Sequence, residues 1–244
     1  MSNKRLIRDF QLLNHDAKNN NFFVDNSSDL SQIDTIIIGS KDTPYEGGFF
    51  WIQMKPKERY PFESPKGTFM SPVQNLRVHP NLYCEGKICL SILGTWSGPS
   101  WTSLLNFSSI ILSIQSILCD NPITNEPGCE NCKKDSRMSI NYNMVVKYTT
   151  LRIILNFLQQ KYRISLYLQD KINEYVMDNI DEYEKLFCEN KENLITDNNI
   201  RYYGLNNIKL NFSELYEEWQ ILEIKKILEI KKILEIKKIE PIDV

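Results

Sequence analysis

Alanine is almost absent from this chain. Ala17 is the single alanine among 244 residues, which include 30 isoleucines, 24 asparagines and 21 lysines. Alanine is the strongest helix former and is normally common, so its absence indicates a bias in the coding sequence. A/T-rich codons, as in some protists and large viruses, would produce this bias. The asparagine-rich loops therefore carry little functional information.

Long apolar runs and an excess of positive charge are also lacking. No stretch approaches 18 uninterrupted apolar residues, and residues 1–20 contain no continuous apolar core. We therefore expect no transmembrane helix, no secretory signal and no membrane partner. This places the chain in the cytoplasm and/or nucleus, or in the host cytoplasm if it is viral. A formal net charge of −2 leaves little positive charge for phosphates, so no nucleic-acid partner is expected.

The remaining composition is typical of a folded protein. Hydrophobic residues make up 42% and aromatic residues 11% of the chain, which argues against global disorder. The length allows one large domain, or one ordinary domain with an extension. Without a secretory signal, free thiols are the better interpretation of the six cysteines, which are Cys84, Cys89, Cys119, Cys129, Cys132 and Cys188.

The apolar pattern predicts an α+β fold. Strand-like runs separated by turn residues indicate an antiparallel meander of four strands, at 22–24, 35–38, 49–54 and about 68–70. Helical spacing predicts helices over 4–13, 103–118, about 140–160 and 166–188. The intervening residues 60–102 are dense in Pro, Gly, Asn and Trp, and so long an irregular stretch is usually functional.

The C-terminus contains three copies of ILEIKK, at Ile221–Lys226, Ile227–Lys232 and Ile233–Lys238. On a helix each copy is rotated by about 240°, so no single apolar stripe forms and a coiled coil is disfavoured. On a strand the even period keeps the apolar residues on one face. Three interpretations stay open: a tandem duplication in the gene, a partner-binding or self-associating tail, and a helix continuing from residues 212–220.

The most informative segment is residues 79–93, which reads HPNLYCEGKICLSIL and places Cys89 eight residues after Asn81. Upstream lie YEGGFF at 45–50 and YPF at 60–62, and Trp101 follows downstream. Over roughly residues 4–160 this set resembles the ubiquitin-conjugating (E2) enzymes.

Two further segments resemble the large E2s that have a GTW-x-GP insertion and a helical C-terminal extension. They are GKICLSILGTWSGP at 86–99 and NPITNEPG at 121–128. That group includes the E2 charged by the second ubiquitin-activating enzyme, and the conjugating domain of the giant inhibitor-of-apoptosis ligases. The resemblance implies a conjugating core over residues 1–160, a helical extension over 161–220 and a repeat-containing tail over 221–244.

The resemblance also implies a chemistry. Cys89 would accept ubiquitin, or a ubiquitin-like modifier, as a thioester from an activating enzyme (E1), and pass it to a substrate lysine or an E3 ligase cysteine. Asn81 would either stabilise the oxyanion or hold the active-site loop, and the sequence does not separate these roles. His79 and Pro80 would be structural residues of that loop. No bound cofactor and no metal are expected, since ATP is used by the E1.

The residues that would surround the incoming substrate lysine, called the lysine gate below, depart from the family pattern. Alignment of the helix after the cysteine places Asn125 where standard E2s often have Asp or Ser. An asparagine cannot act as a base, so acidic help would come from Glu126 or Asp120.

Contacts with the E1 and with E3 ligases are expected at Arg5, Pro61 and Phe62. The loop over residues 101–105 reads WTSLL and lacks the family's Ser-Pro-Ala, which disfavours ordinary RING ligases.

Alternative readings concern the whole chain and its other thiols. A catalytically inactive E2-like scaffold that binds ubiquitin generally lacks the cysteine that is present here. A cysteine hydrolase would need a base and an orienting group, and only His79 is offered. The lone C-x-x-C of Cys129 and Cys132 allows a metal ligand pair or a redox pair, although ordinary free thiols are favoured.

The remaining thiols have simpler interpretations. Cys84 lies close enough in sequence to Cys89 for a disulfide under oxidation. Cys119 and Cys188 fall at or near apolar helix faces, where packing is the expected role.

Overall fold

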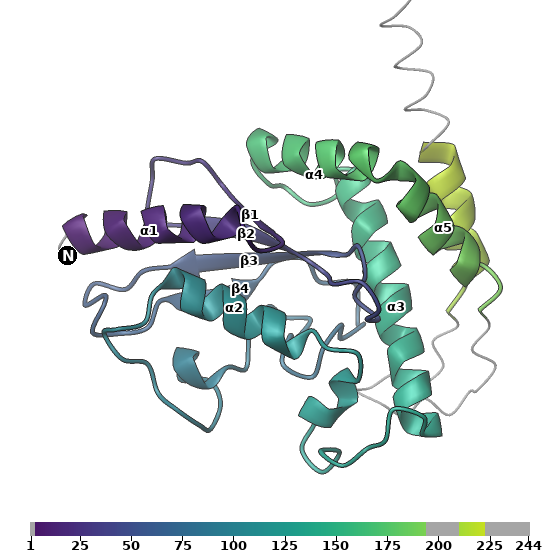
Figure 1. Cartoon of the computed structure of the whole chain (residues 1–244), viewed down its shortest axis with the longest axis horizontal. Coiled ribbons are helices and arrows are strands. Elements are labelled where there is room, and N and C mark those ends of the chain that lie inside the picture. The colour runs from purple at the N-terminus through teal and green to yellow at the C-terminus, as the bar shows by residue number, and fades with distance from the viewer. Residues whose placement is uncertain (1–2, 194–209, 223–244) are drawn as a thin grey trace, which may run out of the picture.

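The computed structural model describes residues 3–193 and 210–222. The elements in chain order are α1 (Asn3–Ala17), β1 (Phe22–Val24), β2 (Ile33–Ile38), β3 (Phe49–Lys55), β4 (Lys66–Phe69), η1 (Ser91–Leu93), α2 (Phe107–Ile117), η2 (Pro122–Asn125), α3 (Arg137–Leu158), α4 (Leu166–Asp178) and α5 (Ile180–Asn190). Residues 212–222 form one more helix, drawn in yellow-green in Figure 1. None of the described helices has the length and apolar character needed to cross a membrane.

The sheet is an antiparallel meander in the order β1-β2-β3-β4. Phe23 pairs with Ile36, and Ile36 pairs in turn with Trp51 on β3. The sheet and its flanking helices confirm the α+β class expected from the sequence. The first three strands lie within about two residues of their predicted positions, because turn residues separate apolar runs of strand length.

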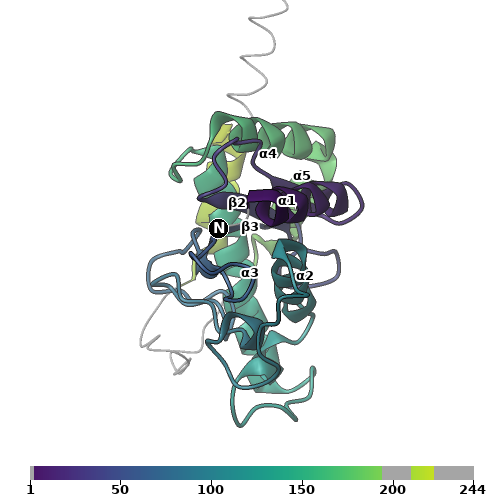
Figure 2. The same ribbon diagram turned by 90° about the vertical axis from the view of Figure 1, so that its left-hand side faces the viewer.

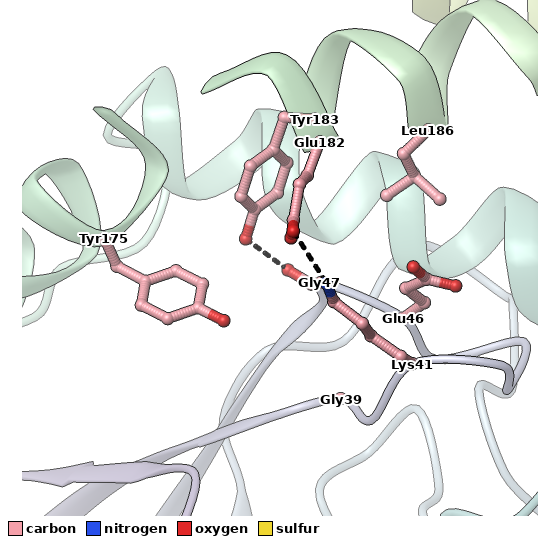
Figure 3. A pocket seen from close by; sticks show the side chains of 8 residues that line it. All are labelled: Gly39, Lys41, Glu46, Gly47, Tyr175, Glu182, Tyr183 and Leu186. Atoms are coloured by element: carbon pink, nitrogen blue, oxygen red, sulfur yellow. Dashed lines mark hydrogen bonds and ion pairs between the residues drawn. The ribbon is translucent and has the colours of Figure 1, made fainter. Parts of the chain in front are cut away.

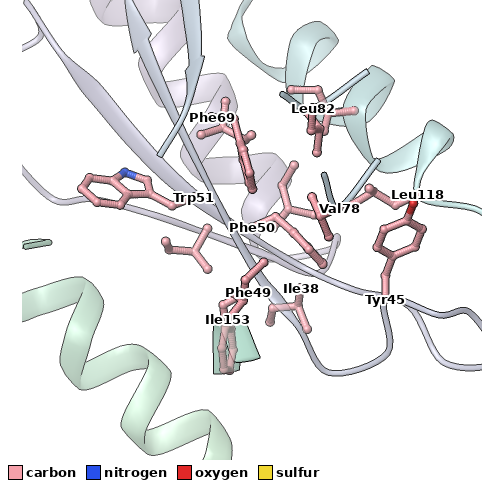
Figure 4. Packing of buried hydrophobic residues seen from close by; sticks show 14 of the residues in the cluster. Ile38, Tyr45, Phe49, Phe50, Trp51, Phe69, Val78, Leu82, Leu118 and Ile153 are labelled. Carbon is pink, nitrogen blue, oxygen red and sulfur yellow. The ribbon is translucent and has the colours of Figure 1, made fainter. Parts of the chain in front are cut away.

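Helices cover both faces of this sheet. In two perpendicular views α2 lies on one side of the strands and α4 on the other, while α3 stands at one end (Figures 1 and 2). The ring of Phe49 on β3 contacts Phe157 of α3, Tyr175 of α4 and Tyr183 of α5. On the opposite face Phe50 packs edge-on against Tyr45, within the core shown in Figure 4. Strand β3 is therefore buried on both faces, which explains its continuous apolar sequence.

Two predicted helix boundaries are wrong. The helix predicted from residue 103 begins at Phe107, because Asn106 caps it by accepting a hydrogen bond from the Ser109 amide. The single helix predicted over 166–188 is broken at Asn179, whose side chain donates to the Tyr175 carbonyl at 2.8 Å. The chain turns there, so that α4 and α5 bring separate side chains to the sheet.

The helices after residue 160 dock directly on the turn between β2 and β3 (Figure 3). Tyr183 Oη donates a hydrogen bond to the Gly47 carbonyl at 2.8 Å, and Lys41 pairs with Glu182 at 2.6 Å. Gly47 has φ +69°, and a Cβ atom there would lie 3.3 Å from the Tyr183 ring. The turn therefore favours glycine both for its conformation and for the close approach of α5.

The final helix packs on α5. Phe187 stacks on Trp219 with ring centroids 4.8 Å apart, and Trp219 Nε1 donates to Glu184 at 2.6 Å. Of the predicted tail, Ile221 and Leu222 continue this helix, and the rest of the ILEIKK repeat lies outside the described residues.

Candidate active site

The segment that carries Cys89 is tied to the edge of the sheet. Gly86 adopts φ +89° and closes a turn by donating its amide to the Tyr83 carbonyl at 3.0 Å. Its own carbonyl accepts the amide of Phe69 on β4 at 2.9 Å. A Cβ atom on residue 86 would lie 3.0 Å from the Phe69 carbonyl oxygen. This close approach and the positive φ account for the glycine before the cysteine.

Two hydrogen bonds join Cys89 and Asn81, one between their backbones and one from the Asn81 side chain. The Cys89 amide donates to the Asn81 carbonyl at 2.9 Å, and Asn81 Nδ2 donates to the Cys89 carbonyl at 2.7 Å. Cys89 is only 1% exposed and Asn81 8%. Asn81 Oδ1 is buried, with no hydrogen-bond partner in the described part of the chain. In this geometry the Asn81 amide fixes the backbone of the cysteine, and one of its two N–H groups is used in doing so.

A second clamp comes from Thr95, in the insertion after the cysteine. Its hydroxyl accepts a hydrogen bond from the Leu90 amide at 2.9 Å and lies 2.6 Å from the Ile88 carbonyl, to which it donates. Thr95 thus binds the residues on both sides of Cys89. In the sequence Thr95 is only part of the GTW-x-GP motif, and this role was not predicted. The only sequence signal for this role is a hydroxyl side chain a short loop after the candidate nucleophile.

His79 is fully buried behind the same loop. Its Nδ1 accepts the Asn81 amide at 2.9 Å, and its Nε2 lies 3.0 Å from the Ile117 carbonyl. A carbonyl only accepts, so these partners assign the proton to Nε2. Burial lowers the pKa of His79 to about 3, assisted by the charge of Arg77 and opposed by the bond to Ile117. The imidazole is neutral near pH 7 and its lone pair is occupied, so it has no free base to offer Cys89.

Pro80 also takes part in the loop, through Arg77. The Arg77 guanidinium donates to the Pro80 carbonyl and stacks over the Tyr83 ring at 3.6 Å.

Cys84 lies in the same loop, where burial and the neighbouring Glu85 raise its pKa. A raised pKa keeps this thiol protonated and works against disulfide exchange with Cys89.

The three gate candidates follow α2 on a single stretch of chain. Asp120 forms an ion pair with Lys134 at 2.8 Å, which lowers the pKa of the Asp120 carboxyl. Asn125 ends η2 and donates to the Pro122 carbonyl at 3.4 Å, and the partly buried Glu126 follows it. The helix before this stretch contacts the Cys89 loop at its last residue, where the Ile117 carbonyl bonds to His79. The roles of Asp120, Asn125 and Glu126 in lysine transfer stay predictions.

The structure brings the predicted partner-binding residues together at one end of the molecule. Arg5 on α1 pairs with the buried Asp9 at 2.7 Å and donates to the Leu105 carbonyl at 3.0 Å. Trp101 Nε1 donates to the carbonyl of Pro61 at 2.7 Å, and the Tyr60–Pro61 peptide bond is cis. These bonds join α1 to the loops at 60–62 and 101–105.

Two large apolar side chains project from this end. Phe62 is 75% exposed and Leu104 is 87% exposed. Both flank the hydrogen-bonded junction of the 60–62 and 101–105 loops. Phe62 was predicted from the sequence, whereas Leu104 was expected on the apolar face of the helix predicted from residue 103. Its signal is an apolar residue in the short loop between Trp101 and the helix cap Asn106.

A cavity of about 370 Å³ lies between β4 and the Cys89 segment. Ile88 and Thr95 line it on one side, and the lysines at 57, 66 and 87 lie around it. Ile88 directly precedes Cys89, but Cys89 itself is buried and does not line the cavity.

Comparison with known families agrees with this geometry. The family model described as ubiquitin-conjugating enzyme matches residues 5–150. The match spans more than half of the chain, and the chain belongs to the ubiquitin-conjugating enzyme family. The resemblance read from the HPN and GKICL motifs is thereby confirmed.

Individual relatives show which members of this family the chain is similar to. Ubiquitin-conjugating enzyme E2 Z of Xenopus tropicalis is 40% identical over 150 residues, which is 61% of this chain and 48% of that relative. E2 Z of Homo sapiens is 39% identical over 150 residues, 61% of this chain and 42% of the relative. E2 T of Xenopus laevis is 34% identical over 148 residues, 61% of this chain and 72% of the relative. The chain thus spans about half the length of the E2 Z relatives it matches.

Proposed function

We propose that this chain is an E2 acyltransferase that carries ubiquitin, or a ubiquitin-like modifier, as a thioester on Cys89. The observation that supports this most directly is the double clamp on Cys89. Asn81 and Thr95 fix the backbone on both sides of one thiol, inside the region that matches the family model. A cysteine that only filled the core would not need its flanking peptide groups held by two side chains.

The first step is transfer from the E1. The Cys89 thiolate attacks the carbonyl carbon of the E1 thioester and forms a tetrahedral oxyanion, which collapses by expelling the E1 thiolate. The Cys89 thiol proton leaves to solvent. Since Cys89 is 1% exposed, its sulfur reaches a second protein only if neighbouring side chains or the exposed loop at 94–100 move aside.

The second step is transfer to an acceptor. A substrate lysine amine, or an E3 thiolate, attacks the Cys89 thioester and expels the Cys89 thiolate. The amine must lose its proton before it attacks, and the carboxylates on the stretch after α2 are the candidates to assist. Asp120 is held by Lys134, which leaves Glu126 as the favoured acid or base. Asn81 acts mainly by holding the loop in its reactive form.

The partners follow from the same proposal. They are the modifier, an E1, an E3 ligase and a protein that offers a lysine. The end formed by Arg5, Pro61, Phe62 and Leu104 is the proposed docking surface for E1 and E3. All six cysteines are free, which favours a reducing compartment such as the cytoplasm or nucleus. No bound cofactor is proposed, because the E1 uses the ATP.

A charging assay tests the proposal. The full chain is mixed with ubiquitin, ATP and each of the two known ubiquitin-activating enzymes. We expect a reductant-sensitive band heavier by one ubiquitin, which disappears in Cys89→Ala. In Cys89→Lys the adduct should become stable to reductant, because an amide replaces the thioester. No band with either enzyme, or a band that persists in Cys89→Ala, overturns the assignment.

A further inference from the structure

Three sulfur atoms converge on the turn between η2 and α3. Cys132 Sγ lies 3.5 Å from Met138 Sδ, and Cys129 Sγ lies 3.9 Å from the same atom. All three side chains are partly buried against the core. The acyl-transfer proposal uses none of these groups.

The backbone around the cluster is well determined by hydrogen bonds. The Cys129 amide donates to the Glu126 carbonyl and the Cys132 amide to the Cys129 carbonyl, each at 2.9 Å. Asn121 Nδ2 donates to the Cys132 carbonyl at 2.8 Å. Met138 lies in the first turn of α3, directly after the helix is capped by Ser136. Two successive turns and a helix start therefore hold the three donors in place without a ligand.

The donor set selects for a soft metal ion. Two thiolates and a thioether are the ligands that Cu(I) prefers, whereas Ca²⁺ and Mg²⁺ take oxygen. Structural zinc is four-coordinate with Cys, His or carboxylate ligands, and within residues 3–193 and 210–222 no three such side chains form a metal-binding group. The cluster offers only two of them, and its third donor is a thioether.

The spacing also fits a trigonal site. Metal–sulfur bonds are about 2.3 Å long, so three sulfurs around one ion in a plane lie about 4 Å from each other. The two separations to Met138 Sδ are 3.5 Å and 3.9 Å. Both separations are close to this spacing, and the three side chains are only partly buried, so they can adjust on binding.

We propose that Cys129, Cys132 and Met138 form a binding site for one monovalent soft cation, Cu(I). Binding replaces the two thiol protons, which leave to solvent, and forms three metal–sulfur bonds with no change in oxidation state. The site links the turn that follows the gate candidates to the start of α3. Metal binding at this site does not involve Cys89 and does not depend on whether Cys89 carries a thioester.

The test is an anaerobic competition titration of the full chain carrying Cys89→Ala, which keeps copper off the proposed nucleophile. Cu(I) is supplied as its bicinchoninate complex, and withdrawal of one equivalent is read from loss of the complex's colour. We expect Met138→Leu, which keeps the side-chain volume, to weaken binding at least tenfold, and Cys129→Ser or Cys132→Ser to weaken it a hundredfold or more. Cys84→Ser and Cys188→Ser are the matched thiol controls and should bind as before.

X-ray absorption on the loaded protein gives a second readout that needs no variant. Three sulfur neighbours at about 2.2–2.3 Å support the site. Failure to withdraw copper, two sulfur neighbours only, or unchanged affinity in Met138→Leu overturns it. A redox pair would instead show a mass loss of two hydrogens in air, equally in Met138→Leu and without bound metal, and that outcome also overturns the proposal.

Discussion

Two cysteine-bearing segments of this protein differ in how they are held. The Cys89 segment is buried and its backbone is bonded from both sides by Asn81 and Thr95, so the position of one sulfur is set by groups that are not sulfur. The turn with Cys129 and Cys132 is more exposed, and there the sulfurs face another sulfur. A thiol presented singly by fixed peptide groups suits covalent chemistry, whereas thiols gathered around a thioether suit coordination. The neighbouring groups thus determine which chemistry a cysteine is suited to.

The largest expected effect separates the two segments directly. Cys89→Ala should abolish thioester formation, because no other thiol is placed by the clamp. The double variant Cys129→Ser/Cys132→Ser should keep its charging rate within about twofold. Single-turnover charging followed on non-reducing gels measures both. Loss of charging in the double variant would show that Cys129 and Cys132 are not separate from the thioester chemistry.

Asn81→Ala should lower the rate of transfer to lysine by about 10²-fold, because the backbone of Cys89 is no longer held in its reactive form; loss of an oxyanion donor would have an effect of similar size. It leaves the Cys89 carbonyl unbonded, so the free energy of unfolding should also fall by about 1–3 kcal/mol. Discharge of the pre-charged protein onto free lysine gives the rate, and urea denaturation gives the stability. A slow but fully stable variant would favour the oxyanion role over the loop role.

Thr95→Val should cost about tenfold in both charging and discharge, since valine keeps the shape of threonine but cannot bond to Leu90 or Ile88. Thr95→Ser restores the hydroxyl and should recover most of the rate. The matched control is Thr124 in η2, which makes one hydroxyl bond, to the Asn121 carbonyl at 2.8 Å. If Thr124→Val slows charging as much as Thr95→Val, the second clamp has no special role.

The last effect concerns pH and acts on stability, not on the reaction rate. Burial lowers the pKa of His79 to about 3 in the folded chain, against 6.5 when it is unfolded. Above pH 6.5 neither state binds the proton, and below it the unfolded state does, so stability falls on acidification toward pH 3. Between pH 6.5 and 5 this one group should remove about 1.6 kcal/mol of unfolding free energy.

Urea denaturation at several pH values measures this slope. His79→Gln is less stable overall but should lose the contribution, and His15→Gln is the matched control at an exposed histidine. An identical slope in wild type and His79→Gln would show that His79 titrates normally.

The sheet was predictable from the sequence because its apolar runs are short and separated by turn residues. The break at Asn179 was not, since the apolar stripe of α4 and α5 keeps helical spacing across it and only the contact of Tyr183 with Gly47 requires the turn. Cys89 and Asn81 stood out because their spacing is a family motif. Thr95 was missed because its bonds to Ile88 and Leu90 depend on how the short loop between them folds. Leu104 was missed because an apolar residue with helical spacing is expected to be buried, whereas the helix begins only at Phe107 and leaves Leu104 exposed.

The sulfur cluster shows the same limit. The C-x-x-C of Cys129 and Cys132 is visible in the sequence, but its third member lies six residues beyond Cys132 and is a methionine, which metal-site patterns omit. Only the fold shows that the first turn of α3 returns Met138 to the two thiols.

The docking of α5 on the turn before β3 has a consequence during synthesis. Tyr183 is made 136 residues after Gly47, to which it bonds. At about 5–20 residues per second, the ribosome needs on the order of ten seconds to supply it. For most of that interval Phe49, the first residue of β3, lacks the rings of Tyr175 and Tyr183 that cover it in the folded chain. The nascent chain therefore leaves this buried ring without its final packing until late in translation.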